Sequence, residues 1–458
     1  MKKSPLAIMM ILEVVIISSC SKDVTNKVNG EEPLLQSNQC ITSEEFLALQ
    51  VKTKGKVMPF EEAVALYKDI LPLTKGESVN ADDCKKTLWI NVHSGAYTKS
   101  SETEKVPVYV VKTGDIHTLI SGDRRVKGIL AEIENYNESN VKNHGVEFFF
   151  DGLQMYMERE IERFNRHYDS LLVSVSDKMN TTKAGDLDDS QMWLTTSSRS
   201  LRDEVKPNLL KVTWGQEYPY NKTLDTVTHP IGFSVIPPVG CTNVAVAQIM
   251  SHYKYPTTYV YANKTYSFDW DKMTSNPKAF LVKEPFRTQI ADLMYIVGKA
   301  TKTEYTWTSG TTGTVKLMAG LDELNYTYQR SAYSFSSVRN SLIDDTPVYM
   351  EGEYTDTNKV QHAHSFILSG YKSNIIEYTD RVYKYIGGEN GNPNELNSTD
   401  WVLFSEDIST TEFNSVYINW GYDGDDDGYY TSYALGIVGN KYVDKAKIFL
   451  NVKPKNNQ

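Results

Sequence analysis

Several features of common protein classes are missing from this 458-residue chain. It has no excess of positive charge, because 48 basic and 58 acidic residues give a net charge of −10, which argues against nucleic acid as a partner. It contains no long internal repeat and no low-complexity tract. Hydrophobic residues make up 40% of the chain, which excludes wholesale disorder. The length allows two or three domains with a sizeable core.

Cysteine is also scarce, with four residues in the whole chain. Cys40 and Cys84 lie early in the sequence and could pair in an oxidising compartment or remain free thiols. Cys241 is the only cysteine in the last two thirds of the chain. Without a nearby partner it is a candidate for a reactive thiol, although a small buried hydrophobic side chain is the simpler interpretation.

No apolar run near the N-terminus is long enough to span a membrane as a mature helix. Leu6 to Ile17, preceded by Lys2-Lys3, is typical of a secretory signal. The segment Ile17-Ser18-Ser19-Cys20 resembles a bacterial lipobox, which implies that Cys20 is lipidated and becomes the mature N-terminus of the protein. Ordinary signal cleavage with full release is the alternative. Residues 21–39 are polar and predict a tether, so we expect a lipid-anchored protein of the cell envelope, at the outer membrane or surface, unless processing releases it.

Residues 40–182 have the pattern of a small α+β domain. Thr42 or Ser43 can cap a first helix, and a second is expected from Phe60 to Ile70. Alternating segments predict antiparallel strands, and a long charged and apolar stretch predicts one or two helices. The expected strands are 87–92, 106–112, 117–121 and 126–131, and the helical stretch is 148–179. We find no catalytic constellation in this region.

The composition changes at residues 183–200, which are polar, acidic and then rich in hydroxyl groups. This change predicts a linker between the first domain and a second one at 201–458. Such a linker is also a suitable place for proteolytic processing.

The strongest local signal for chemistry surrounds Cys241. Pro237, Pro238 and Gly240 exclude a helix up to this residue, and a run of small and apolar residues after it predicts one. Ala245 and Ala247 would let that helix pack closely against its neighbours. A thiol at a helix N-terminus is favoured as the thiolate by the unpaired N–H groups and the helix dipole.

Three further segments could complete a thiol-based site. Attack on an acyl carbon needs an imidazole, a polar group that orients the imidazole, and a donor for the oxyanion. His364 heads an apolar strand, Asn419 ends another, and Gln216 follows Trp214-Gly215 upstream of the cysteine. Each signal is weak when taken alone. His362 is a rival base, but the spacing to Gly370-Tyr371 favours His364.

Taken together and in this order, the segments resemble the streptopain family of papain-like cysteine peptidases. The matching stretches are Trp214 to Asn221, Gly240 to Met250, His364 to Tyr371 and Asn419 to Tyr430. Ser365 stands where this family usually has alanine. The resemblance covers roughly residues 200–458, and residues 118–130 also resemble the family's propeptide.

The resemblance implies an α+β fold with a papain-like catalytic domain, in which the helix bearing Cys241 packs on an antiparallel sheet. It further implies a secreted or surface-anchored endopeptidase, made as a zymogen whose N-terminal domain inhibits the active site until it is cut away near 185–205. Cys241 and His364 would form a thiolate–imidazolium pair, and Asn419 would accept the far ring N–H of His364. Gln216 and the Cys241 N–H would hold the oxyanion, and Trp420 would shield the Asn419–His364 bond. Gly240 and Trp214 would have supporting roles.

The partners expected from this interpretation are protein or peptide substrates, the chain's own propeptide and, through the lipid, a membrane. We expect a monomer that requires neither a metal nor an organic cofactor. The residues Asp423 to Gly428 fit the start of an EF-hand calcium loop, but Ala434 stands where a bidentate glutamate is needed, so an acidic turn is the simpler interpretation. Similarly, Ser309 to Thr314 lacks the lysine of a phosphate-binding loop and predicts a loop that leads into a helix at 315–324.

Two alternatives to a hydrolytic peptidase remain open from the sequence. The chain could be a surface lipoprotein that uses the same fold as a non-catalytic binding or inhibitory module. The same site could also transfer acyl groups or cleave isopeptides.

Overall fold

The computed structural model describes residues 40–71, 84–94, 102–136, 143–179, 191–355, 360–386, 400–441 and 446–455. The proposed lipobox and the tether at 21–39 lie outside these residues, as does most of the acidic part of the expected linker. Cys40 is disulfide-bonded. Whether Cys84 is its partner falls outside the described side chains.

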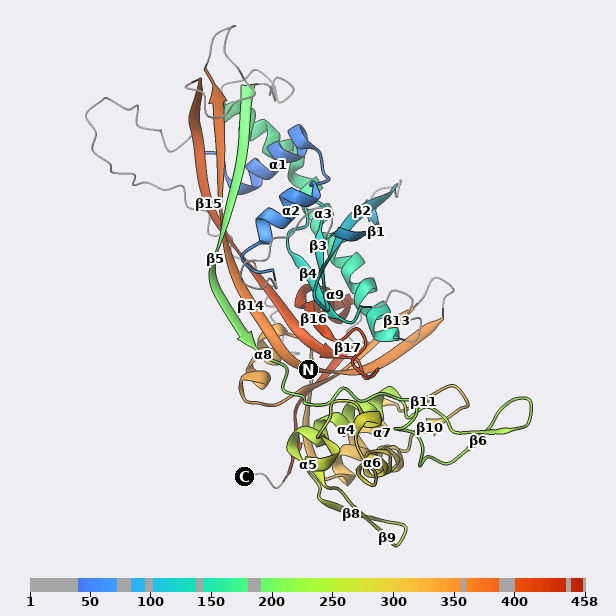
Figure 1. The fold of residues 1–458 in the computed structure, drawn as a ribbon. Coiled ribbons are helices and arrows are strands. Elements are labelled where there is room, and N and C mark those ends of the chain that lie inside the picture. The colour runs from blue at the N-terminus through green and yellow to red at the C-terminus, as the bar shows by residue number, and fades with distance from the viewer. Residues whose placement is uncertain are drawn as a thin grey trace, which may run out of the picture. The chain divides into compact units, whose positions relative to one another are not determined.

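The helices and strands follow one another along the chain as in Figure 1. The helices are α1 (Ser43–Lys54), α2 (Phe60–Tyr67), α3 (His144–Lys178), α4 (Cys241–Tyr253), α5 (Trp270–Met273), α6 (Phe286–Ala300), α7 (Thr314–Glu323), α8 (Phe335–Ile343) and α9 (Ser432–Lys441), with a short 3-10 helix at Ala279–Leu281. The first strands are β1 (Cys84–Ser94), β2 (Glu102–Thr113), β3 (Ile116–Ser121), β4 (Ile129–Glu134), β5 (Met192–Lys206), β6 (Val227–Thr228), β7 (Ser234–Val235), β8 (Thr258–Tyr261) and β9 (Lys264–Ser267). The later strands are β10 (Glu304–Tyr305), β11 (Gly310–Thr311), β12 (Tyr326–Ala332), β13 (Val348–Thr355), β14 (Gln361–Tyr385), β15 (Trp401–Asn419), β16 (Gly428–Thr431) and β17 (Ala446–Pro454).

The chain forms two compact units, each built from three stretches of sequence. One unit contains Met1–Gly55, His167–Leu201 and Ile375–Glu412, and the other contains Lys56–Arg166, Arg202–Asn374 and Phe413–Gln458. Neither unit coincides with the expected segments 40–182 and 201–458. Residues 192–200 also differ from the expected linker, because they form the first part of β5. Threonine in this hydroxyl-rich stretch is well suited to a strand, which a reading by polarity alone overlooks.

In the smaller unit, α1 begins as its sequence predicts. The side chain of Thr42 accepts from the Glu45 N–H and Glu45 accepts from the Thr42 N–H, which is a complete capping box. Glu45 also pairs with Lys178 at 2.6 Å. The start of α1 is therefore stabilised both by its own capping box and by the ion pair with the last turn of α3.

Early and late parts of the sequence contribute strands to one large antiparallel sheet. Its strand order is β1-β2-β3-β4-β16-β15-β14-β13-β17-β12, with β5 paired to β14. The central pairing joins β16 to β4, with Tyr429 opposite Glu132. The N-terminal region and the region bearing Cys241 thus share one sheet rather than forming separate sheets.

Side chains on β13 and β14 alternate between two hydrophobic cores, as the period of a strand requires. Met350 and Phe366 belong to a core that includes Phe148 and Met157 of α3. Tyr349 and Ile367, their chain neighbours, belong to a second core with α4. The sheet therefore has α3 packed on one face and α4 on the other.

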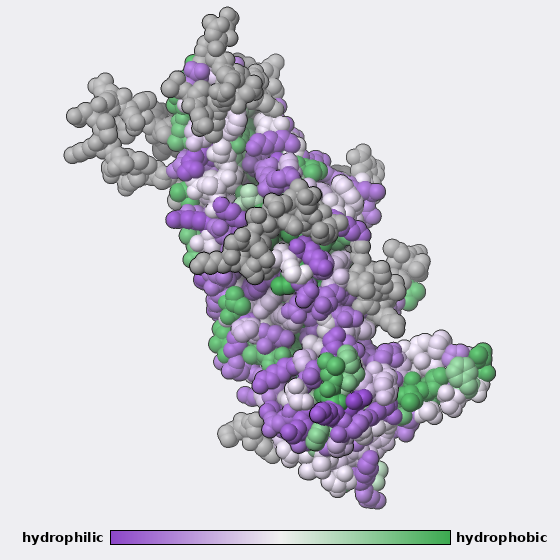
Figure 2. Space-filling view, in the orientation of Figure 1, coloured by the Kyte–Doolittle hydropathy of each residue, from purple (hydrophilic) through white to green (hydrophobic). Residues whose placement is uncertain are grey.

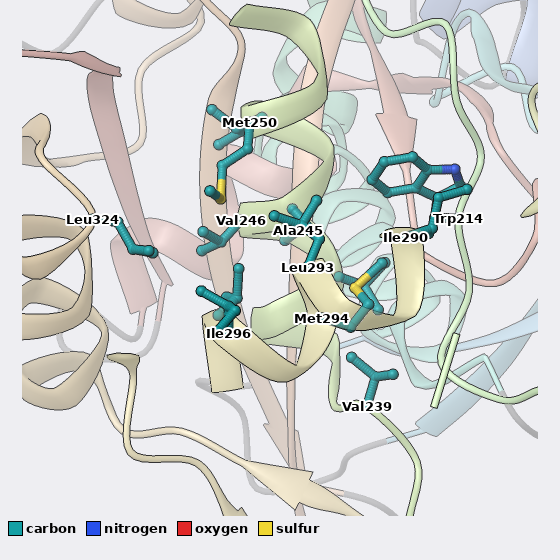
Figure 3. Close-up of a cluster of buried hydrophobic side chains, with 14 of the residues drawn as sticks. Trp214, Val239, Ala245, Val246, Met250, Ile290, Leu293, Met294, Ile296 and Leu324 are labelled. Carbon is teal, nitrogen blue, oxygen red and sulfur yellow. The ribbon is translucent and has the colours of Figure 1, made fainter. Parts of the chain in front are cut away.

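The second core fixes the position of α4. Ala245, Val246 and Met250 of this helix are fully or almost fully buried against side chains of α6, including Leu293 and Ile296 (Figure 3). Phe449 of β17 belongs to the same cluster. The expected architecture, a helix bearing Cys241 packed on an antiparallel sheet, is confirmed.

Hydrophobic side chains also gather on the hairpin formed by β6 and β7, as Figure 2 shows. Ile231 and Phe233 are strongly exposed there, and the ring of His229 stacks on Phe233 and meets the edge of Trp307.

No helix within the described ranges is both long enough and apolar enough to span a membrane.

Candidate active site

Cys241 is the first residue of α4, and the backbone before it admits only glycine. Gly240 has a φ of +91°, which disfavours any L-residue with a side chain. A Cβ at this position would also collide with the carbonyl oxygen of Gly310. The close approach of the 310 loop and the turn into the helix therefore both depend on Gly240, which fits its predicted supporting role.

Three of the four predicted catalytic residues line one cavity of about 580 Å³, namely Gln216, Cys241 and His364. The wall also contains residues from the 308–312 loop, from β14 and from the turn after β15. The remaining lining residues are His144, Glu217, Pro238, Thr242, Thr308, Ser309, Gly310, Thr311, Thr312, Ala363, Ser365, Tyr422, Asp423 and Asp425. Ser309 and its neighbours thus line the cavity ahead of α7, and Gly310 and Thr311 form strand β11 where the sequence predicts a loop.

Opposing effects act on the Cys241 thiol. Burial raises its pKa above the ordinary value of 9.0, and the polar groups of Ser365 together with the backbone N–H groups of Thr242 and Cys241 partly offset that rise. These backbone donors are the unpaired N–H groups that a helix start offers. Burial is the largest of these effects, so the net shift of the thiol pKa is upward.

His364 is fully enclosed, and its imidazole is neutral near neutral pH. Burial lowers the pKa of its imidazole to about 4. Its Nε2–H donates to the carbonyl oxygen of Trp420 at 2.8 Å. The ring stacks on Tyr422 with centroids 5.3 Å apart.

His364 therefore does not make the expected contacts with Cys241 and Asn419. Among the described residues, no hydrogen bond joins the imidazole to either of them. Asn419 is completely buried, and its Oδ1 accepts from Gln248 Nε2 at 3.0 Å and from the Gly421 N–H at 3.1 Å. Burial also disfavours the charged forms of the Cys241 thiol and the His364 imidazole in this arrangement.

Gln216 lines the same cavity as the Cys241 thiol, together with Tyr422. The side chains of Trp214 and Trp420 are completely buried. The indole N–H of Trp420 donates to Tyr430 at 3.1 Å. Trp420 thus holds the imidazole through its own carbonyl group instead of shielding a bond to Asn419.

Gln248 is a residue of the site to which the sequence gave no role. It lies on the buried face of α4, where its Oε1 accepts from the Trp214 N–H at 3.2 Å and its Nε2 donates to Asn419. One amide therefore connects three of the matched segments. Its position within the apolar run from Val244 to Met250 was the available signal.

The start of α3 forms part of the wall of the cavity. Asn143 caps this helix by accepting from the Gly145 N–H at 3.1 Å, and its Nδ2 donates to Asp426 at 3.1 Å. A Cβ on Gly145 would collide with the Trp420 ring and lie 2.8 Å from Cδ2 of His364. His144 lines the cavity and stacks on His362 with centroids 4.8 Å apart. A segment from the N-terminal region is thus in direct contact with His364.

The acidic turn after Asn419 uses its carboxylates for local bonds. Asp423 accepts from the Tyr220 hydroxyl at 2.5 Å, and Asp427 accepts from the Trp420 N–H at 2.8 Å. Burial raises the pKa of Asp427 well above its ordinary value. Within the described part of the chain, no group of three or more His, Cys, Asp or Glu residues is arranged to hold a metal ion.

Comparison with known proteins finds one matching family model. Residues 214–430 match the model of the Peptidase C10 family, in agreement with the resemblance seen in the sequence. Among curated proteins, none matches the chain.

Two solved structures from Prevotella intermedia are similar to this chain. A mutant fragment of prointerpain A is 19% identical with a TM-score of 0.46, and the match covers 80% of this chain and 100% of that one. Active wild-type interpain A, a cysteine protease, is 22% identical with a TM-score of 0.36, and the match covers 54% of this chain and 95% of that one.

The burial of His364 predicts a dependence of stability on pH. An imidazole with a pKa of about 4 when folded and 6.5 when exposed stays neutral on folding, so protons bind preferentially to the unfolded chain between these values. We expect the free energy of unfolding to fall by about 3 kcal/mol through this group as the pH drops from about 6.5 to about 4. Above pH 6.5 the group has no such effect.

Urea denaturation at a series of pH values measures this effect. Two chains are compared, one with Cys241→Ala and one with Cys241→Ala and His364→Asn, so that self-cleavage cannot interfere. Carboxylates contribute equally to both. If the two stability curves run parallel below pH 6.5, the imidazole is not buried as the neutral form.

Proposed function

We propose that this chain, whose residues 214–430 match the model of the Peptidase C10 family, is a cysteine endopeptidase made as a latent precursor. The observation that carries the proposal is the common cavity of Cys241, Gln216 and His364, with the thiol at the start of a helix. A helix start supplies N–H donors for both a thiolate and an oxyanion. These are the requirements of acyl transfer to sulfur.

In the active form, His364 would take the proton of Cys241, and the thiolate would attack the carbonyl carbon of a peptide bond. The Gln216 side chain and the Cys241 N–H would hold the oxyanion, a contribution worth about 3 kcal/mol for one donor in comparable hydrolases. His364 would then protonate the leaving amine, and water would release the acyl group from sulfur. For this role the imidazole must leave the Trp420 carbonyl and approach the thiol.

Latency follows from the contact between the start of α3 and His364. Gly145 packs against Trp420 and the imidazole, and Asn143 ties this helix start to Asp426. While these contacts persist, the imidazole is desolvated and bonded away from Cys241. Since β5 begins at Met192, we place the activating cut in the part of the expected region that precedes it, at 185–191.

The first prediction concerns the nucleophile. We expect the purified 21–458 chain under reducing conditions to shorten to a fragment starting near 185–191 and to cleave denatured casein. The Cys241→Ala variant should do neither, because without the thiol no acyl-enzyme forms. Intact mass and casein fragments are the measurements.

The alternative, a non-catalytic binding module, is favoured by one observation, the absence of a Cys241–His364 bond among the described residues. If the wild type is inert, the N-terminal region is removed with an added protease and a thiol-directed epoxide is applied. A fragment that neither labels at Cys241 nor cleaves casein would support the binding module. An added amine nucleophile distinguishes acyl transfer from hydrolysis by its appearance in the product.

The second prediction concerns latency. In Gly145→Ala the new methyl group would collide with Trp420, so the start of α3 should move away from His364. We expect self-processing to be several-fold faster than in the wild type, measured by intact mass over time. Gly436→Ala is the matched control, because its Cβ would meet only Tyr333 at an ordinary 3.8 Å.

Destabilisation of the whole chain must be distinguished from release of the imidazole. The Gly145→Ala fragment should therefore start at the same residue as the wild-type fragment, and Cys241→Ala should block its formation. Processing at an unchanged rate, in a variant that folds, would contradict the role given to this contact.

We further propose that the protein is exported and anchored through a lipid on Cys20, a residue outside the described part of the structure. The support is the sequence alone, Ile17-Ser18-Ser19-Cys20 behind an apolar run. We expect cells fed radiolabelled fatty acid to label the wild type and not the Cys20→Ala variant. A known lipoprotein in the same cells is the positive control, and an unlabelled wild type beside a labelled control excludes the anchor.

A further inference from the structure

Asn243, two residues after Cys241 on α4, has a completely buried side-chain amide that the proposed mechanism does not use. Its Nδ2 donates to the carbonyl oxygen of Val239 at 2.8 Å and to the hydroxyl of Thr303 at 2.9 Å. Its Oδ1 accepts from the hydroxyl of Thr301 at 2.9 Å. Burial of an amide is costly unless its polar atoms are hydrogen-bonded, and here both ends of the amide have partners.

A backbone group fixes the orientation of this amide. A carbonyl oxygen only accepts hydrogen bonds, so the nitrogen of Asn243 must face Val239 and its oxygen must face Thr301. The N–H of Val239 in turn donates to the carbonyl oxygen of Gln216 at 2.9 Å. Val239 therefore joins α4, through its carbonyl group, to the segment that carries the proposed oxyanion donor.

On its other side the amide is connected to the wall of the cavity. The hydroxyls of Thr303 and Thr312 are 2.7 Å apart, and Thr312 lines the cavity together with residues 308–311. The connection does not depend on which hydroxyl donates, because Thr303 can accept from Asn243 and still either donate to Thr312 or accept from it. Asn243 is thus bonded towards both the Gln216 segment and the 308–312 wall.

Tyr305 competes for the second hydrogen of the amide without breaking this connection. Its hydroxyl is 3.2 Å from Asn243 Nδ2, which is a longer distance than that to Thr303. Thr303 is also 3.1 Å from Asn243 Oδ1, to which it can donate, so it stays bonded to the amide in either case.

Backbone packing brings the two walls together at the same point. A Cβ on Gly310 would lie only 2.9 Å from the carbonyl oxygen of Val239, the group to which Asn243 donates. The wall at 308–312 therefore rests directly on the backbone that the amide holds.

We propose that Asn243 is a positioning residue that sets the separation of the two walls, and with it the fit of a peptide substrate in the cavity. It acts through Val239 on one side and through Thr303 and Thr312 on the other. The proposal deepens the proposed peptidase function and rests on it for its biological meaning. Loss of the Thr312 bond should loosen the 308–312 wall alone, whereas loss of the amide should also loosen the Gln216 segment.

Hydrogen exchange of the full chain tests the proposal without any peptidase assay. All variants carry Cys241→Ala, so that self-cleavage cannot interfere, and exchange is measured by mass spectrometry on peptides from residues 304–312. Thr312→Val keeps the shape of the side chain and removes its hydroxyl. We expect these amides to exchange about three- to tenfold faster, which is the effect of one neutral hydrogen bond on a local opening equilibrium. Thr312→Ser retains the hydroxyl and should exchange like the parent chain.

Thr274→Val is the matched control. Thr274 is also half-buried, its hydroxyl donates to the Trp270 carbonyl oxygen at 2.7 Å, and it does not line the cavity. Its substitution should leave exchange at 304–312 unchanged. Thermal unfolding of each variant confirms that the fold persists.

A double variant links the effect at Thr312 to the amide. Asn243→Ala should speed exchange at 304–312 at least as much as Thr312→Val does. The two substitutions together should exchange no faster than Asn243→Ala alone, because both interrupt one chain of bonds. If Asn243→Ala does not fold, Thr303→Val interrupts the same chain and takes its place.

Kinetics of peptide cleavage by the self-processed enzymes, with Cys241 intact, measure the consequence for substrate. We expect Thr312→Val to raise KM about three- to tenfold and to change kcat by less than about twofold, since the wall binds the substrate and takes no part in the chemistry. Asn243→Ala should also lower kcat, because it releases Val239 and with it the Gln216 segment.

The proposal fails if folded Thr312→Val exchanges like its parent at 304–312, or if Thr312→Ser exchanges as fast as Thr312→Val. Additive effects of Asn243→Ala and Thr312→Val would equally contradict it, as would a Thr312→Val enzyme with a lower kcat and an unchanged KM. A wild type that never cleaves peptide, beside the expected changes in exchange, contradicts the peptidase function and leaves the positioning role of Asn243 intact.

Discussion

The hydrogen bond from His364 to the carbonyl oxygen of Trp420 decides the state of this site. A backbone carbonyl can accept only from a protonated ring nitrogen, so this bond fixes the proton on Nε2 of the neutral imidazole. The stacking on Tyr422 and the packing of Gly145 hold the ring in the same place. The thiol, by contrast, keeps donors that belong to α4 and β14. The two halves of the proposed catalytic pair are therefore supported by different parts of the molecule.

The shared sheet explains how an early segment can control a late one. The pairing of β4 with β16 places the N-terminal region directly beside the turn that follows Asn419. The cap of α3 then reaches the same turn through Asn143 and Asp426. Main-chain pairing fixes register, whereas a docked side chain alone would not. The position of Gly145 against the imidazole is thus set by backbone geometry at several points.

Much of the site could be predicted from the sequence because the signals were local. Pro237, Pro238 and Gly240 before an apolar run place Cys241 at a helix start, and alternating residues place His364 on a strand. The bond to the Trp420 carbonyl could not be predicted, since a backbone acceptor has no signature in the sequence. The role of Gln248 and the β4–β16 pairing depend on contacts between segments more than 100 residues apart. The strand at 192–200 was missed because polarity was given more weight than the β-propensity of threonine.

The energetics of the proton explain why rotation of His364 alone does not complete the site. Burial raises the pKa of the Cys241 thiol and lowers the pKa of the His364 imidazole to about 4, so burial opposes moving the proton from the sulfur to the ring. Approach of the two groups adds their mutual attraction but does not remove the cost of desolvating both charges. Formation of the ion pair requires that the site also become more polar or hydrated, which displacement of the start of α3 would provide.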